Sequence, residues 1–398
     1  MSNTVESDKR IYLDYAAATP LDPEVLSKML PYFDGSYGNP SSMYASGRRA
    51  KRAIDKARQQ VAQVINASPE EIIFTGSGTE SDNAALLGVA RANRIAGDHI
   101  IISAIEHKAV LESGQELERE GFKVTVLPVD EYGFVNVKEC ASCITPRTTL
   151  VSVMYANNEI GTIEPIQELG AAIKKHRNAD QFPFFHTDAC QAAGFLDLDV
   201  KELGVDLMTL NGSKIYGPKG IGMLYKRAGV RMSPIIVGGE QEMNLRAGTE
   251  SVPLIVGFAE ALVKVNNHRD QENKRLSALR NYFIGRLRDE IPGVVVNGDF
   301  ERRLPNNIHI SIPQIEGESI VLMLDQHGIE ASTGSACSAR DLKPSHVLLA
   351  LGQNADIAHG SIRFSLGRYT DKEEIDTVME IFPGIVEYLA SISALTVV

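Results

Sequence analysis

Residues 71–103 have the sequence EIIFTGSGTESDNAALLGVARANRIAGDHIIIS. Apolar runs of strand length at 71–75 and 99–103 flank a segment of helical period at 77–94. A strand, a helix and a second strand in this order form the repeating unit of a parallel sheet covered by helices. The stretch therefore predicts an α/β fold.

The same alternation continues to about residue 226. Further strands are expected at 123–128, 150–155, 182–188 and 206–210, with helices at 107–120 and 165–177. This pattern predicts a mostly parallel sheet with helices on its faces. Ligands bind such sheets beyond the carboxyl ends of the strands. Polar motifs that follow strands are therefore the candidates for a functional site.

The chain has 398 residues, more than a single hydrophobic core normally supports, so two domains are expected. We predict a large domain over 20–264 and a small α+β domain made of 1–19 and 265–398. A charged amphipathic stretch at 265–292 predicts a long surface helix that leads into the small domain. Strands near 307–312 and 361–366 and a helix at 318–326 complete the expected small domain.

Composition excludes several classes of protein. The formal net charge of −11 disfavours a nucleic-acid partner, because phosphate binding needs clustered Lys and Arg. No apolar run approaches the roughly 18 residues of a membrane span, and the start MSNTVESDKR has no signal-peptide character. We expect a cytoplasmic protein that does not associate with a membrane and has no metal site. Cys140 and Cys143 form a CxxC without a second pair or nearby His, which favours incidental thiols over a metal or redox pair.

The first polar motif is FTGSGTES at residues 74–81, between a strand and a helix. Ser77 and Glu80 have capping-box spacing, and Gly76 and Gly78 allow a ligand to approach the backbone closely. Free amides at a helix start, together with the Thr79 hydroxyl, would bind an anion. An ordinary helix cap is the alternative, and no Lys follows as in a Walker loop.

Two further motifs follow expected strands. In FFHTDACQ at 184–191, Asp188 ends an apolar run and is either a helix cap or the partner of a cationic ring nitrogen. In LNGSKIYGPKG at 210–220, Lys214 lies among glycines and small polar residues, a setting for a partly desolvated amine with a lowered pKa. Lys219 is the competing amine, but its Pro–Lys–Gly context better suits a solvated turn.

The fourth motif, ASTGSACSAR at 331–340, contains Cys337 among small residues without apolar periodicity. A structural cysteine is usually surrounded by large apolar residues, whereas a nucleophilic thiol suits an exposed loop. An incidental loop cysteine is the alternative. Cys190, beside Asp188, is interpreted as a small packed residue.

These four segments, in this order, resemble the cysteine desulfurases of the NifS/IscS type within the class V aminotransferase-like enzymes. The resemblance extends from YLDYAAATP at 12–20 to SIRFSLGR at 361–368, and includes GNPSS at 38–42, EHKAV at 106–110, NNEIG at 157–161 and RAGT at 246–249. It implies a fold-type I transferase that uses pyridoxal 5′-phosphate. In that fold the large domain has a mostly parallel seven-stranded sheet, and a smaller α+β domain carries the cysteine loop.

The resemblance also implies roles for individual residues. Lys214 would bind the cofactor covalently and move the substrate α-proton, Asp188 would hold the ring nitrogen, and His107 would stack on the ring. The remaining cofactor-binding residues would be Gly78, Thr79, Asn158, Gln191, Asn211, Ser213 and, from the second subunit of a homodimer, Thr249. Arg363 would bind the substrate carboxylate as a bidentate fork, with Asn39 and Asn158 nearby.

The implied reaction converts L-cysteine to L-alanine. Cys337 would take the sulfur as a persulfide and pass it to an acceptor protein for iron–sulfur cluster assembly or for tRNA or cofactor thiolation. The sequence departs from the family at Ser213, where most relatives have His, at Asn211, where Ser is frequent, and at Tyr15, where Asn is common. Both Ser213 and Asn211 can still donate to a phosphate. The C-terminal SALTVV lacks the polar extension with which some relatives hold a scaffold protein.

Three alternatives remain open at this level. A selenocysteine lyase or cysteine-sulfinate-acting relative would share the scaffold, whereas an aminotransferase would need no loop thiol. A catalytically silent subunit that binds the cofactor and recruits partners is favoured only by the unusual residues before Lys214. A dinucleotide-binding enzyme is disfavoured, because no GxGxxG follows a strand near the N-terminus.

Overall fold

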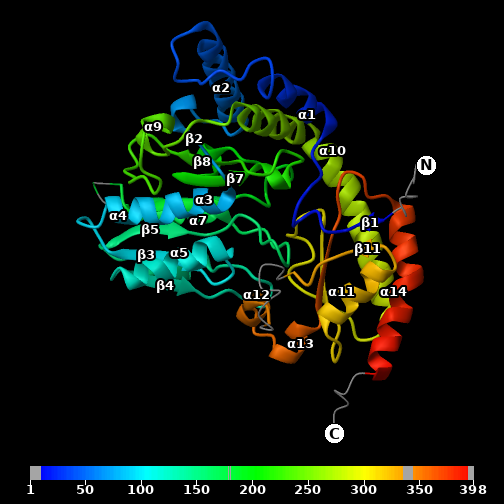
Figure 1. Cartoon of the computed structure of the whole chain (residues 1–398). Helices are drawn as coiled ribbons and strands as arrows, with labels where there is room; N and C mark the ends of the chain where they lie inside the picture. The colour runs from blue at the N-terminus through cyan, green and yellow to red at the C-terminus, as the bar shows by residue number, and fades with distance from the viewer. Residues whose placement is uncertain (1–9, 178, 180, 335–343, 393–398) are drawn as a thin grey trace.

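The computed structural model describes residues 10–177, 179, 181–334 and 344–392 (Figure 1). Its centre is a seven-stranded sheet in the order β2-β8-β7-β6-β5-β3-β4. The strands are β2 (Ile72–Thr75), β3 (His99–Ser103), β4 (Lys123–Leu127), β5 (Thr148–Ser152), β6 (Phe184–Asp188), β7 (Leu207–Asn211) and β8 (Gly222–Lys226). The predicted α/β class with a mostly parallel sheet is confirmed.

Strand β8 is the one strand of this sheet that the apolar pattern did not indicate. Strands β3 to β7 pair in parallel with one another, whereas β8 runs antiparallel to both β7 and β2. Antiparallel neighbours can be joined by a short connection, while parallel neighbours need a crossover. Residues 212–221, which include Lys214, form this short return between β7 and β8.

Helices cover both faces of the sheet. On one face lie α1 (Pro23–Met29), α2 (Ala45–Val64), α6 (Val137–Cys143), α7 (Ile166–Lys175), α8 (Val200–Leu203) and the first part of α10 (Val252–Glu290). The opposite face is covered by α3 (Gly78–Asn83), the π-helical segment η3 (Ala84–Gly88), α4 (Val89–Ala92) and α5 (Lys108–Arg119). Alternate residues of each strand supply the two cores: Ile101 packs on the first face, and Ile100 and Ile102 on the second.

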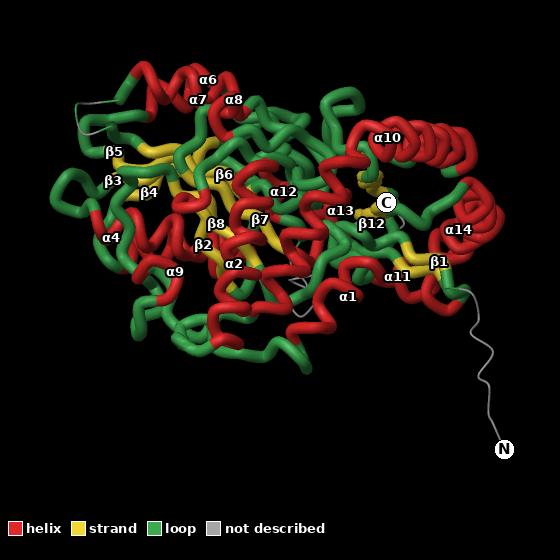
Figure 2. The backbone as a smooth tube through the Cα atoms, turned by 90° about the horizontal axis from the view of Figure 1, so that it is seen from above, coloured by secondary structure: helices red, strands yellow, loops and turns green. Residues whose placement is uncertain are grey.

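A second hydrophobic core lies beside the large sheet (Figures 1 and 2). It contains an antiparallel sheet in the order β12-β10-β9 and a parallel pair formed by β1 and β11. These elements are β1 (Ile11–Tyr12), β9 (Val295–Val296), β10 (Asn307–Ser311), α11 (Gly317–Gln326), β11 (Ile329–Glu330), β12 (Ser361–Ser365) and α14 (Lys372–Ile392). The N-terminal strand β1 thus pairs with a strand more than 300 positions later in the chain.

Helix α10 connects the two cores. The expected helix at 265–292 is extended at its start to Val252, because the apolar stretch before residue 265 packs on α1 and α2. Its second half packs against α14, and both helices lie side by side in Figures 1 and 2. The proposed boundary between 264 and 265 therefore falls inside one continuous helix. The division into domains stays a prediction.

The remaining elements are short: η1 (Leu30–Tyr32), η2 (Pro69–Glu71), η4 (Gly212–Lys214), α9 (Gln241–Asn244), α12 (His346–Ala350) and α13 (Ala355–His359). Helices α12 and α13 pack on Ile105 and Met154, which follow β3 and β5. This contact brings residues near the C-terminus to the carboxyl edge of the large sheet. Within the described ranges, no helix has the length and apolar character needed to cross a bilayer.

The packing of the second core predicts which substitutions in it will destabilise the protein. Phe364 is fully buried between Phe283 and Phe382, with ring centroids 5.1 and 5.7 Å away. Phe364→Ala should lower the free energy of unfolding by about 3–5 kcal/mol, because it removes apolar burial and leaves a cavity. Urea unfolding of the whole chain measures the change. Leu322→Ala, at a side chain 65% exposed, is the control, and an equal loss in both variants would contradict the assignment.

Candidate active site

A pocket of about 330 Å³ opens at the carboxyl ends of the central strands. Its walls come from loops of the large sheet and from the second core, which supplies Gly334 and Arg363. Predicted site residues that line it are Gly78, Thr79, His107, Asn158, Asp188, Gln191, Asn211, Ser213, Lys214 and Arg363. The structure therefore brings together residues from motifs that are up to 285 positions apart in the chain (363 − 78).

Lys214 ends the short η4 turn after β7 and points toward the N-terminal segment. Its Nζ donates hydrogen bonds to the carbonyl oxygens of Ala16 at 2.8 Å and Ala17 at 2.6 Å. Burial lowers the pKa of this amine below its ordinary value, and the nearby charge of Arg363 lowers it further. A buried amine with a lowered pKa is suited to nucleophilic attack on a carbonyl group.

One end of the pocket has the donors that an anion requires. Asn211 ends β7, and its Oδ1 accepts the Ser213 hydroxyl at 3.0 Å, which leaves the amide Nδ2 to face Gly78. A Cβ at Gly78 would come within 2.9 Å of that Nδ2 and 3.0 Å of the Cys190 sulfur. The absence of a side chain at Gly78 thus forms a cradle between the helix start and Asn211.

Asp188 ends β6 and is 6% exposed, with its Oδ1 accepting the amide of Cys190 at 2.9 Å. The carboxylate therefore holds the turn that follows the strand and also lines the pocket. Both interpretations of this residue from the sequence, a backbone cap and a ligand-facing carboxylate, describe contacts that one side chain can make.

Two further carboxyl groups lie buried near Asp188. Burial, with repulsion from Asp188, raises the pKa of Asp82 well above its usual range, and Asp82 Oδ1 has no hydrogen-bond partner among the described residues. His186 lies 3.7 Å from Asp82, but burial lowers its pKa to about 4, so the ring is neutral at neutral pH. Its two nitrogens instead contact the hydroxyls of Ser152 and Thr209 at 2.8 and 3.1 Å.

Glu106, beside His107, is the second of these buried acids. Its Oε1 accepts the Ser103 hydroxyl at 2.6 Å and the Met154 amide at 2.7 Å, and burial raises its pKa to about 8. At neutral pH Glu106 is therefore neutral.

His107 and Gln191 line opposite parts of the pocket. His107 caps α5, and its Nδ1 accepts the Ala109 amide at 3.1 Å, so a neutral ring carries its proton on Nε2. Gln191 donates through Nε2 to the Ala16 carbonyl at 2.9 Å. The Ala16 oxygen thus accepts from both Gln191 and Lys214 and connects the N-terminal segment to the pocket.

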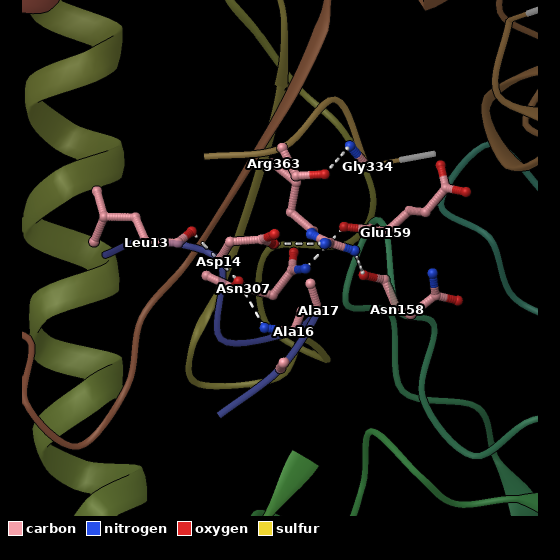
Figure 3. Close-up of polar contacts among 12 residues, drawn as sticks. Leu13, Asp14, Ala16, Ala17, Asn158, Glu159, Asn307, Gly334 and Arg363 are labelled. Atoms are coloured by element: carbon pink, nitrogen blue, oxygen red, sulfur yellow. Dashed lines mark hydrogen bonds and ion pairs between the residues drawn. The ribbon is translucent and has the colours of Figure 1, made fainter. Parts of the chain in front are cut away.

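Arg363 lies in the middle of β12, and its side chain is only 3% exposed (Figure 3). Nη1 donates to the Asn158 carbonyl and Nη2 to Asp14 Oδ1, both at 2.7 Å. Its Nε is buried without a partner in the described chain. Arg363 is therefore not a surface residue. Its guanidinium is held in place by these two hydrogen bonds, and further N–H groups remain to donate to a ligand.

Two predicted site residues do not line this pocket as the structure shows it. Asn39 and Thr249 are exposed and do not line the pocket of their own chain. Asn39 Oδ1 accepts the Ser41 amide at 2.9 Å. Cys337 lies outside the described residues, although Gly334 before it and His346 after it both line the pocket.

Two other candidates receive ordinary structural explanations. Lys219 is exposed and donates to the Thr19 carbonyl, away from the pocket. Cys140 is buried on α6 with a pKa raised to about 12 by burial, which makes its thiol unreactive. No group of residues suited to hold a metal occurs in the part of the chain that the structure describes.

Several residues of the site were not indicated by the sequence. Asp82, Glu159 and His346 line the pocket, and Asp14 contacts Arg363 from behind it. Asp14 falls inside the quoted YLDYAAATP motif, and Asp82 lies three positions after Thr79 on the same helical segment. Helical spacing could have found Asp82; the position of Asp14 depends on pairing between the two ends of the chain.

The fold and pocket define an α/β enzyme of fold type I, with a partly buried lysine after one strand and an aspartate at the end of its neighbour. The family model described as Aminotransferase class-V matches residues 11–378. A protein named cysteine desulfurase IscS from Clostridium botulinum (strain Kyoto / Type A2) is 48% identical over 390 residues, which cover 98% of this chain and 97% of the relative.

Solved structures agree. One described as a NifS-like protein has a TM-score of 0.89 and 37% identity, covering 96% of this chain and all of the other (100%). Another, described as SspA in complex with cysteine, has a TM-score of 0.79 and 34% identity, covering 91% and 100%. The chain belongs to the aminotransferase class-V family, in the group that includes the IscS-type cysteine desulfurases.

The raised pKa of Glu106 predicts a pH dependence of stability. The carboxyl group stays protonated in the folded chain up to about pH 8, whereas in the unfolded chain it ionises near pH 4.5. Between these values the folded state binds one more proton than the unfolded state. The free energy of unfolding therefore falls by about 1.4 kcal/mol for each unit by which the pH rises. Glu106→Gln should remove this component, because a neutral amide has the same shape.

Urea unfolding of both proteins across pH 5–8, without added ligand, measures the difference. Glu118→Gln, at an exposed glutamate on α5, serves as the control and should leave the pH profile unchanged. If Glu106→Gln parallels the parent protein across this range, Glu106 is ionised in the folded chain and the assignment is wrong.

Proposed function

We propose that this chain is a cysteine desulfurase that binds pyridoxal phosphate through Lys214, converts L-cysteine to L-alanine, and takes the sulfur on Cys337. The observation that carries the proposal is the arrangement of Lys214, Asp188 and Arg363 around one pocket. An amine, a carboxylate and a guanidinium in this arrangement suit, respectively, an aldehyde carbon, a pyridinium nitrogen and an amino-acid carboxylate.

The residues present fit the cofactor. The Gly78 cradle, with the Thr79 hydroxyl and the amide of Asn211, suits a phosphate group, and Asp188 suits the ring nitrogen at the buried end. The Ser213 hydroxyl donates to Asn211 Oδ1 and holds that side chain in place, so the Asn211 Nδ2 remains as a donor at this end. Bound pyridoxal phosphate supplies an electron sink for bonds at the substrate α- and β-carbons.

Lys214 and Arg363 act at opposite ends of the substrate. Burial lowers the pKa of the Lys214 amine, which makes loss of its proton easier, as transfer of the α-proton requires. Arg363 has its Nε and further N–H groups left after bonding Asn158 and Asp14, so it can receive the α-carboxylate. His107, whose Nδ1 accepts the Ala109 amide, lies on the wall as a second proton carrier.

Cys337 supplies the sulfur-accepting thiol in this proposal. Its thiolate attacks the substrate sulfur; a sulfur–sulfur bond forms as the carbon–sulfur bond breaks. The electron pair goes to the substrate β-carbon, which takes up the proton that the thiol has lost, so one persulfide and one alanine result. The assignment is supported by the small-residue motif at 331–340 and by the flanking residues Gly334 and His346, which both line the pocket.

Further parts of the proposal concern partners. We propose a homodimer in which Thr249 of each chain contributes to the phosphate site of the other; the exposure of Thr249 in the single chain leaves it available for this role. The persulfide would pass to an acceptor protein in iron–sulfur assembly or in thiolation of tRNA or a cofactor. The cytoplasmic location and the absence of a nucleic-acid or membrane partner stay predictions.

The alternatives are separated by the pocket and by substrate tests. A silent subunit that binds the cofactor would need Lys214 and Asp188 but not Arg363 at the same pocket, so the presence of Arg363 there favours an active enzyme. A related structure described in complex with cysteine favours that amino acid as the ligand. Release of selenide from selenocysteine at a higher rate than of sulfide from cysteine would identify a selenocysteine lyase instead.

The central test uses the purified protein with pyridoxal phosphate, L-cysteine and a thiol reductant. The parent protein should show a visible absorption band and release sulfide and alanine in equal amounts. Lys214→Ala should lose the covalently bound chromophore, and Cys337→Ala should keep the chromophore but lose at least about 100-fold in sulfide release, as expected when a nucleophile is removed. Cys143→Ala, outside the pocket, is the matched control. Parent-level sulfide release by Cys337→Ala would contradict the mechanism.

The phosphate cradle makes a separate prediction. A methyl group at Gly78 would lie 2.9 Å from Asn211 Nδ2 and would fill the cradle. Gly78→Ala should therefore weaken cofactor binding by about tenfold or more, since both the close approach and the Asn211 donor are disturbed. Titration of the cofactor absorption measures it. Gly384→Ala, at an exposed position where an added Cβ would have no atom within 4 Å, should bind the cofactor normally. Unchanged cofactor binding in both variants would contradict the assignment of the phosphate to the Gly78 cradle.

A further inference from the structure

We infer that Asp14 is a positioning residue that aims Arg363 into the pocket and restricts the substrate to an amino acid with a single carboxylate. The inference rests on the proposed function, in which Arg363 receives the α-carboxylate. It concerns the substrate class: zwitterionic amino acids whose side chain carries no negative charge. Cysteine belongs to this class, whereas aspartate and cysteine sulfinate do not.

The position of Asp14 is fixed by the strands around it (Figure 3). It lies two residues after the end of β1 and forms a parallel bridge to Ser365, which ends β12. The Tyr12 hydroxyl donates to the Asp14 carbonyl at 3.0 Å, and the Ala16 amide donates to the Ser365 hydroxyl at 2.9 Å. Asp14 Oδ1 therefore meets Arg363 Nη2 at 2.7 Å as part of a rigid arrangement.

The guanidinium is oriented from two sides. Asp14 accepts from Nη2, and the Asn158 carbonyl accepts from Nη1. Arg363 itself is 3% exposed and Asp14 19% exposed at the side chain, so both charges are poorly screened by water. An arginine held in this way presents its remaining donors in one direction, as bidentate binding of a carboxylate requires.

The same contact limits the charge that the pocket can accept. The positive charge of Arg363 is already offset by Asp14 before a ligand arrives, and the carboxylate of Glu159 also lines the pocket. A single α-carboxylate accepts hydrogen bonds from Arg363, and these outweigh its repulsion from the carboxylates of Asp14 and Glu159. Among the described residues, the lysines that line the pocket are Lys108 and Lys214, and Lys214 is engaged with the cofactor in the proposed function. A second carboxylate on the ligand, close to Arg363, would meet the fields of Asp14 and Glu159.

Asp14 also influences the reactive amine. Burial is the main cause that lowers the pKa of Lys214; Arg363 lowers it further, while Asp14 and Asp188 raise it. The Asp14–Arg363 pair is therefore nearly neutral as seen from Lys214, and removal of the Asp14 charge would leave Arg363 unopposed. The pair thus influences both ends of the substrate site.

Equilibrium binding to the holoenzyme, followed by calorimetry, tests the inference with two probes that carry no sulfur, L-alanine and L-aspartate. The parent protein should bind L-alanine more tightly than L-aspartate. In Asp14→Asn the amide oxygen still accepts from Nη2, but the negative charge is gone. The dissociation constant of L-aspartate divided by that of L-alanine should therefore fall by about fivefold to tenfold. A purely structural role would weaken both probes equally and leave the ratio unchanged.

Two further variants keep the result interpretable. Asp14→Glu retains the charge and should preserve the ratio even if both affinities fall. Asp22→Asn removes the charge from another Asp–Arg pair, with Arg368, outside the pocket, and should leave the ratio at its parent value. An unchanged ratio in Asp14→Asn, or the same narrowing in Asp22→Asn, would overturn the inference.

The outcome is separable from that of the proposed function. The probes report on the carboxylate site without any turnover of cysteine. If the parent holoenzyme releases no sulfide while the ratio narrows in Asp14→Asn, the desulfurase proposal fails and the role of Asp14 stands. If sulfide is released and the ratio does not narrow, only the role of Asp14 fails.

Discussion

Parallel pairing of β5, β6 and β7 is the constraint on which the site depends. Their carboxyl ends lie at one edge of the sheet, so the residues that follow them, including Asn158, Asp188 and Lys214, converge on one pocket. Such a sheet is buried on both faces, and helices from two layers enclose it. The pocket can therefore combine charged groups from the sheet with residues of the second core.

The second core completes this pocket by supplying Arg363 and Gly334. Arg363 would be costly to bury alone, and its position is stabilised by the Asp14 carboxylate and the Asn158 carbonyl. The N-terminal segment thereby contacts both charged groups of the site: Asp14 binds Arg363, and the carbonyls of Ala16 and Ala17 accept from Lys214. A segment with little secondary structure thus connects the two cores at the place where chemistry is proposed.

Much of the site could be predicted because the relevant signals are local. Asp188 and Lys214 follow apolar runs, and Gly78 lies in a Gly/Ser turn before a helix. Strand β8 and the early start of α10 were missed for a common reason: uniformly apolar segments do not show whether they form a strand, a helix or part of a longer helix. Asp14 and Glu159 were missed because their contacts, with Arg363 and Ser345, come from distant parts of the chain, whereas the helical spacing after Thr79 could have indicated Asp82.

By itself, the sequence determined the class of fold, the family resemblance, and which residue types stand at the ends of the strands. These features follow from hydrophobic period, turn composition and motif order, all of which depend on neighbours along the chain. Only the tertiary structure decided which charges face one another. The neutral state of Glu106, the orientation of Arg363 by Asp14 and the lowered pKa of Lys214 arise from burial and from charges distant in sequence, and both depend on how the strands pair.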